Sequence, residues 1–197
     1  SVDLTVTVTP GTPESIVIEG CQNILASGTS CPVYATVYDQ HDNLVWFDDV
    51  GTYSFSTTDG NFVKVQTNTP HSQPPQPSIY VGDYTGVTVG NWTITISTAT
   101  GLTDSIDVEV THGQMTSLEL VASSAAITAD EILEINATRI DLNGNRLPII
   151  IPLENWTSIA DGTLTSGLTH VWEPKFQGTK KLTATYEGFT ENVSVFV

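Results

Sequence analysis

The chain of 197 residues is long enough for one large all-β domain or for two sandwiches of about 100 residues each. Its hydrophobic fraction of 39% supports ordinary cores and excludes wholesale disorder. The 22 acidic residues outnumber 6 scattered basic ones, giving a formal charge of −16, so we expect no nucleic-acid partner. A solvated surface, adaptation to salty or acidic surroundings and loose cation binding would each explain this acidity. No apolar stretch approaches the roughly 20 residues of a membrane span, which predicts no membrane insertion.

The first predicted element is a strand with one apolar face. Val2, Leu4, Val6 and Val8 alternate with Asp or Thr, which is the two-residue period of a half-buried strand. Two prolines follow within the next five residues and disfavour continuation of a ladder. We therefore assign residues 1–14 to an extended strand and a linker.

The chain contains two cysteines, which lie close together in the first half. The spacing of Cys21 and Cys31 suits a local bridge across a loop or between paired strands. A two-cysteine metal site would still need further His or carboxylate partners, and no His lies close in sequence. We predict a disulfide, with a pair of buried thiols as the alternative.

Short strands with alternating apolar residues follow in both halves of the chain. They are expected at residues 33–38, 92–96 and 106–110, and again at residues 132–140, 182–186 and 193–197. Asp-Gly and Asn-Gly pairs give strong turn signals between strands, and no helical period of useful length is present. The pattern predicts an all-β protein with two tandem immunoglobulin-like antiparallel β-sandwiches, over residues 15–112 and 113–197, preceded by the N-terminal strand.

The two halves read as copies of one unit. Residues 15–62 overlie residues 117–164 at a constant shift of 102 positions, as from Ser15 to Ser117. The alternation slips by one residue between Tyr53 and its counterpart near Trp156, which predicts a bulge or an offset there. The proline-rich stretch 69–77 has no counterpart in the second half, so we expect an exposed loop.

Strand and turn motifs carry a resemblance to a known family. Residues 35–39 form an alternating strand that leads into a turn, and residues 54–60 form a later strand that ends in Asp-Gly. In the second half, the turn reads Asp-Leu-Asn-Gly-Asn over residues 141–145. This combination resembles the bacterial immunoglobulin-like repeats of the invasin and intimin type. The resemblance implies stalks, spacers and adhesive modules on the outside of a cell, and therefore an extracellular, cell-surface location.

The sequence contains few motifs that would indicate an enzyme or a metal-binding protein. The sequence has no Gly-x-Ser-x-Gly elbow and no Gly-rich nucleotide loop, and its four histidines are isolated from one another. Residues 141–145 alternate oxygen ligands like a calcium loop, but the glycine stands at position 4 of the motif and position 12 is Pro152. A turn between strands explains the segment better. We predict no catalytic residue, no cofactor and no metal site.

Four sequons of the form Asn-x-Ser/Thr are the positive chemical signal. They begin at Asn91, Asn136, Asn155 and Asn192. The side chain of Asn192 alternates with apolar neighbours, so it should face solvent and could carry a glycan. Four tryptophans could stack on sugars, although strand alternation favours places in the cores or at the domain junction.

Three interpretations of the N-terminal strand compete. It could belong to a longer array of domains, fold back onto its own first domain, or insert into another copy of the protein as a donor strand. The last interpretation makes the protein a subunit of a self-assembling surface filament, whose partners are other copies of itself, and we take it as the first hypothesis. The alternative is a stalk or adhesin segment of a larger cell-surface or S-layer-like protein, next to further immunoglobulin-like domains. A carbohydrate-binding module comes third, with surface glycans or a receptor as partners.

Overall fold

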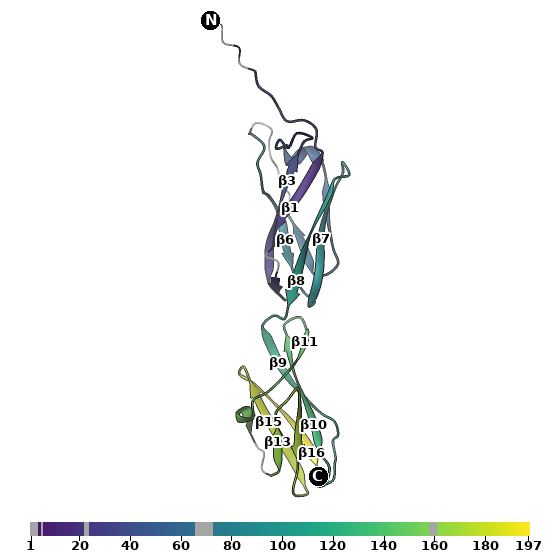
Figure 1. Ribbon diagram of the computed structural model, residues 1–197, viewed down its shortest axis with the longest axis vertical. Helices are drawn as coiled ribbons and strands as arrows, with labels where there is room; N and C mark the ends of the chain where they lie inside the picture. Colours follow the sequence, from purple (N-terminus) through teal and green to yellow (C-terminus); the bar gives the residue numbers. More distant parts are fainter. Residues whose placement is uncertain (1–3, 5, 22–23, 66–72, 158–160) are drawn as a thin grey trace. The chain divides into compact units, whose positions relative to one another are not determined.

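The computed structural model describes residues 4, 6–21, 24–65, 73–157 and 161–197 (Figure 1). The chain divides into two compact units, residues 1–111 and residues 112–197, which we call unit 1 and unit 2. Outside the strands, the described residues form turns, loops and two short 3-10 helices, Phe47–Val50 and Leu153–Asn155. None of the helices in the described parts of the chain has the length and apolarity needed to cross a lipid bilayer.

Unit 1 is a sandwich of two four-stranded sheets. The first sheet has the order β1 (Ser15–Gly20), β3 (Ser30–Tyr38), β6 (Ile79–Thr85) and β5 (Asn61–Lys64). The second has the order β2 (Ile24–Ala26), β8 (Thr103–Thr111), β7 (Gly90–Thr98) and β4 (Tyr53–Thr57). The pairs are antiparallel except β2 with β8, which is parallel.

Unit 2 is built from a five-stranded and a three-stranded sheet. One sheet contains β9 (Met115–Ala122), β10 (Leu133–Asp141), β11 (Arg146–Ile149), β14 (Thr169–Glu173) and β13 (Thr163–Thr165). The other has the order β12 (Trp156–Thr157), β15 (Thr179–Tyr186) and β16 (Phe189–Phe196). The predicted all-β class with immunoglobulin-like sandwiches is thereby confirmed.

Each unit has its own hydrophobic core between its sheets. In β3 the buried apolar side chains are Cys31, Val33, Ala35 and Val37, and the matching strand β10 buries Leu133, Ile135 and Ala137. This two-residue period is the alternation seen in the sequence, because successive side chains of a strand point to opposite faces of the sheet. Each core contains residues of one unit only, so each unit buries an apolar face without the other.

The last strand of each unit is flanked on both sides. In unit 1, β8 pairs with β7 on one side and with β2 on the other. In unit 2, β16 pairs with β15, and on its other side Phe196 forms a parallel bridge with Ala126. Backbone bonds of 2.9 Å from Ile127 N to Phe196 O and 3.0 Å from Phe196 N to Ala125 O pair that side at the end of the strand. Over the described residues, the place of a terminal strand is thus filled in both units.

The bulge or offset predicted between Tyr53 and the region of Trp156 falls partly outside the described residues. The strand β4 pairs with β7 in regular register from Tyr53 to Thr57, whereas β12 has only two residues. Within the described residues, the register shifts occur between Val33 and Tyr34 in the β3–β6 pair, and between Ile140 and Asp141 in the β9–β10 pair. The counterparts of residues 56–58, at positions 158–160, lie outside the described residues, so the predicted offset near Trp156 stays a prediction.

Candidate functional site

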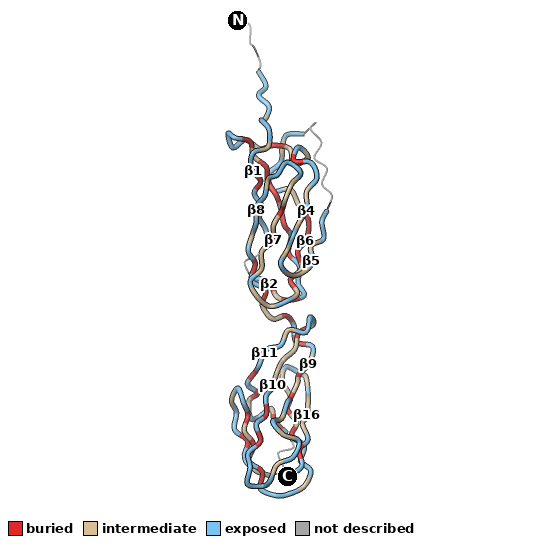
Figure 2. Tube along the Cα trace, turned by 90° about the vertical axis from the view of Figure 1, so that its right-hand side faces the viewer, coloured by how far each residue is buried: buried red, intermediate tan, exposed pale blue. Residues whose placement is uncertain are grey.

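The apolar segment before β1 is the first candidate. The side chains of Leu4, Val6 and Val8 are 85%, 71% and 86% exposed, and the described residues from 4 to 14 contribute no strand (Figure 2). Val2, the fourth member of the predicted face, lies outside the described residues. The alternation is therefore present without a partner sheet in the described structure, and the fold-back interpretation is wrong for the described part of this segment.

The segment leads into a hydrogen-bonded turn around Asp39. The N–H of Gly11 donates to Asp39 Oδ2 at 2.8 Å, across 28 positions of sequence. The N–H groups of His41 and Asn43 donate to Asp39 Oδ1 at 2.9 Å and 3.0 Å, and the side-chain amide of Asn43 reaches both oxygens. We call this arrangement of one glycine N–H, one carboxylate and one asparagine a linker clasp.

Unit 2 contains the same linker clasp at equivalent positions. The N–H of Gly113 donates to Asp141 Oδ2 at 3.0 Å, while Asn143 and Asn145 donate their N–H groups to Oδ1 at 3.0 Å and 2.9 Å. The side-chain amide of Asn145 contacts both carboxylate oxygens. Arg139 adds a bond of 2.7 Å from Nη2 to the carbonyl of Gly113. The two linker clasps thus fix the segments that lead into β1 and β9.

Both carboxylates are held in the ionised form. The bond from Gly11, with those from Asn43 and His41, sets the pKa of Asp39 well below its ordinary value against an opposing effect of burial. Burial by itself would raise the pKa of Asp141, but the bonds from Asn145, Gly113 and Asn143 outweigh it and lower that pKa. These donors occupy both oxygens of each carboxylate, so residues 141–145 form a turn, as expected. Among the described residues, no group of three His, Cys, Asp or Glu side chains could hold a metal ion.

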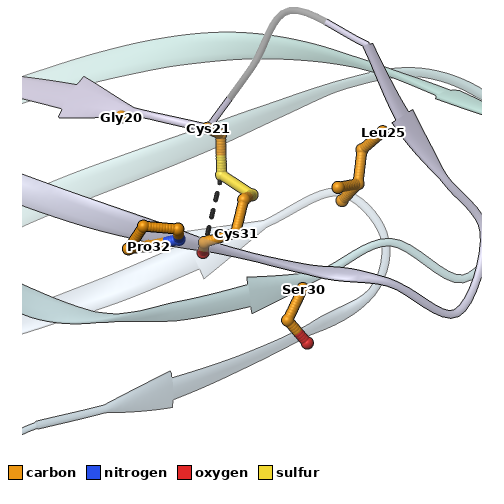
Figure 3. Close-up of a pocket in the computed structure, with 6 residues that line it drawn as sticks. All are labelled: Gly20, Cys21, Leu25, Ser30, Cys31 and Pro32. Carbon is orange, nitrogen blue, oxygen red and sulfur yellow. Dashed lines mark hydrogen bonds between the residues drawn. A yellow bond between two sulfur atoms is a disulfide. The ribbon is translucent and has the colours of Figure 1, made fainter.

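The predicted disulfide is present in unit 1. It joins Cys21, just after β1, to Cys31 near the start of β3, with their Cα atoms 4.9 Å apart (Figure 3). Beside it lies an open groove of about 570 Å³, lined by Gly20, Cys21, Leu25, Ser30, Cys31 and Pro32. At the equivalent place in unit 2, the N–H of Ser123 donates to the carbonyl of Glu134, as Cys21 does to Pro32. Apart from the two cysteines of the disulfide, none of the residues that line the groove has a titratable side chain.

The sequons lie apart from one another. Asn91 at the start of β7, Asn136 on β10 and Asn192 on β16 are exposed, while Asn155 in the second 3-10 helix is half-buried. The side chain of Asn136 also accepts a hydrogen bond of 3.0 Å from the hydroxyl of Thr169. Solvent therefore reaches three of the four asparagines, as glycan attachment requires.

The tryptophans pack into the fold. Trp156 and Trp172 are buried in the core of unit 2, and Trp46 and Trp92 are half-buried with their Nε1 atoms donating to backbone carbonyls. Stacking on a sugar needs an open aromatic face. The two buried indoles have none, which weakens the carbohydrate-binding hypothesis.

Sequence reasoning treated His170 as an isolated residue, but it is buried in unit 2. Its ring lies edge-on to Trp156, with centroids 5.0 Å apart. The N–H groups of Ile151 and Gly167 point at its two ring nitrogens from 3.2 Å. Desolvation lowers the pKa of His170 below its ordinary value, so the ring is neutral in the folded unit at pH 7.

The sequence also contains a signal for the linker clasps. The shift that brings Asp39 onto Asp141 also brings Gly11 onto Gly113 and Asn43 onto Asn145. The turn residues were recognised, but their bond to a glycine 28 positions upstream was not. A pair of glycines at the same distance from a repeated Asp is the pattern that could have revealed it.

Comparison with known proteins rests on structure alone. No protein-family model matches the chain, and no curated protein matches it. Invasin, described as a bacterial integrin-binding protein, matches 94% of the chain over 41% of its own chain, with 17% identity and a TM-score of 0.56. The adhesin FdeC of Escherichia coli matches 98% of the chain over 67% of its own, with 17% identity and a TM-score of 0.55. Domains 5–6 of the S-layer protein SbsC match 96% of the chain over 98% of theirs, with 19% identity and a TM-score of 0.38. At these identities the likeness concerns the fold: the chain has the immunoglobulin-like fold seen in bacterial cell-surface adhesins.

Proposed function

We propose that the chain is a non-catalytic structural segment of a larger cell-surface protein, in which immunoglobulin-like units follow one another as a stalk or spacer. The observation that carries this proposal is the repeated linker clasp. In both units, a buried carboxylate holds the glycine just upstream of the first strand. A device that orders the lead-in of each unit suits a chain of units in series, since it limits the freedom of the linker where it joins the sandwich.

The chemistry of the surface supports a location outside the cell. The disulfide Cys21–Cys31 belongs with an oxidising compartment, where such bonds persist. The fold is shared with invasin, which is described as a bacterial integrin-binding protein, and with FdeC, which is described as an adhesin of Escherichia coli. Only 14% of the residues are charged, so much of the polar surface is uncharged.

Exchange of the units tests the stalk function. In cells that make the protein, residues 15–197 are replaced by two unrelated immunoglobulin-like units of the same length. A spacer tolerates this exchange: parts of the protein beyond the units keep their exposure to protease added to intact cells, and cell attachment is unchanged. Loss of attachment with normal surface exposure contradicts the spacer function and assigns a binding role to the units themselves. If protease and antibody reach the protein only in lysed cells, the cell-surface location is wrong.

Filament assembly by strand donation is the second candidate, and the exposed face of Leu4, Val6 and Val8 favours it. An edge strand with an apolar face is prone to pair with another chain. Deletion of residues 1–9 would then abolish filaments in electron micrographs of purified native protein while leaving both units folded. Native protein that shows single particles at high concentration excludes this candidate.

A further inference from the structure

We infer that the segment around Leu4–Val8 is the terminal strand of one further immunoglobulin-like sandwich, which lacks such a strand of its own and stands before unit 1 in the series. This inference rests on the proposed function, because it needs units in series. The segment would lie in a slot between two strands of this incomplete sandwich, with its apolar face toward the core of the sandwich.

Register is the first argument. At the shift of 102 positions, Leu4, Val6 and Val8 fall on Ile106, Val108 and Val110 of β8, the terminal strand of unit 1. The same shift brings the clasp glycine Gly11 onto Gly113. Val8 precedes its clasp glycine by three positions, and Val110 precedes Gly113 by three positions. The segment therefore precedes the linker clasp of unit 1 by the same distance in sequence as β8 precedes the linker clasp of unit 2.

Burial is the second argument. In β8 the side chains of Val108 and Val110 are each 1% exposed, because the strand closes the core of unit 1. Their counterparts Val6 and Val8 are 71% and 86% exposed. An apolar stripe of this length in water is a liability for a soluble unit, and placement in a sandwich core removes it. The described residues of unit 1 supply no such place for the segment.

The strand positions already taken in units 1 and 2 identify the kind of acceptor. In the described parts of both units, the place of the last strand is already taken: β8 pairs with β7 and, over residues 109–111, with β2, while β16 pairs with β15 and, at Phe196, with residues 125–127. The free edge of β1 is also occupied in part, since Ile18 N donates to Asp104 Oδ2 at 2.8 Å. In the place that β8 or β16 holds, a second copy of either unit could accept the segment only by losing its own last strand. An incomplete sandwich needs no such exchange.

The slot follows from the pairing of β8. One wall is an antiparallel neighbour like β7, and the other is a short parallel neighbour like β2. Inward positions take Leu4, Val6 and Val8, and the alternate residues, such as Thr7, face solvent. The linker clasp at Gly11 then follows directly, as the clasp at Gly113 follows β8.

A chimaera tests the inference, because unit 1 without β8 is a sandwich that lacks its terminal strand. Residues 15–102 are placed directly before the full chain, so that Ser1 follows Leu102 in the position that Thr103 has in unit 1. We expect a third cooperative unfolding transition, and amide exchange at Leu4, Val6 and Val8 slowed at least a hundredfold relative to the 197-residue chain. The positive control carries residues 15–111 before residues 10–197, which keeps β8 in its own slot. A second variant, Val6→Asp in the first chimaera, should abolish the added transition while units 1 and 2 stay folded.

Two results overturn the inference. In one, the control gains its third folded unit but the chimaera does not, or the amides of residues 4–8 exchange as fast in the chimaera as in the parent chain. In the other, the parent chain alone forms oligomers in which the amides of residues 4–8 are protected, which assigns the segment to exchange between copies. The experiment is carried out in solution, so a failed surface-location test of the proposed function leaves its outcome untouched.

Discussion

Replacement of Asp141 by alanine should destabilise unit 2 strongly, because it removes the acceptor at the centre of the second linker clasp. Asp141 is 2% exposed, and the substitution leaves the N–H groups of Gly113, Asn143 and Asn145 without their partner. The bond to Gly113 is buried and the others are partly buried, so water can replace the latter in part. With about 2 kcal/mol for the buried charged bond and roughly 0.5 kcal/mol for each of the others, the loss is about 3 kcal/mol. For a unit of this size that corresponds to a fall in Tm of roughly 12–24 °C.

Urea unfolding followed by hydrogen exchange of peptides from β10 and β16 measures this loss in unit 2, while peptides from β3 report on unit 1. The matched control is Asp130→Ala, which removes an exposed carboxylate from the same unit. A loss below about 1 kcal/mol, or an equal loss in the control, refutes the structural role of the clasp. The pH dependence is a second check. Because folding lowers the pKa of Asp141, its contribution is present above the pKa of the unfolded chain and fades as the pH falls. The difference between Asp141→Ala and the parent should therefore shrink below about pH 4.

Three further predictions concern single features. Mass measurement after alkylation should show no modified cysteine until reductant is added, and two modified cysteines in the unreduced protein would rule out the bond between Cys21 and Cys31. Native protein should carry a glycan on at least one of Asn91, Asn136, Asn155 and Asn192, whereas an intact mass equal to that of the bare polypeptide contradicts this. The free energy of unfolding of unit 2 should fall between pH 7 and pH 5, because the unfolded chain protonates His170 more readily than the folded unit does. His170→Gln should remove that slope, and exposed His41→Gln should leave it; a slope that survives His170→Gln shows that other groups cause it.

The fold was predictable from local patterns. Alternation in residues 33–38 and 132–140 marks the buried positions of β3 and β10, and the Asp-Gly pairs mark turns that need a positive φ. Gly60 and Gly162 have φ values of +80° and +84°, and a Cβ on either would overlap a carbonyl oxygen of the neighbouring strand, Thr85 or Glu173. Such signals depend on two or three adjacent residues, so one sequence suffices to read them.

Contacts between residues far apart in the sequence could not be predicted from local patterns. The bond from Gly11 to Asp39 joins residues 28 positions apart, and the bond from Ile151 N to the buried ring of His170 joins residues 19 positions apart. The same limit applies to the N-terminal segment. Alternation established an apolar face on residues 2–8, but the choice of partner required knowing which strand positions are already filled in units 1 and 2.

Internal comparison of the two units separates what the fold needs from what each copy has added. Cys21 and Cys31 of unit 1 correspond to Ser123 and Leu133 of unit 2, where a buried leucine takes the place of one half of the disulfide. The backbone bond at this point is the same in both, so the sandwich forms with or without the covalent link. The disulfide is therefore a reinforcement of one unit, whereas the carboxylate that holds the upstream glycine is present in both. A feature that both copies share at the point where one unit follows another bears on how units are joined, and this is why the proposal of a segment built from units in series rests on the linker clasps and not on the disulfide.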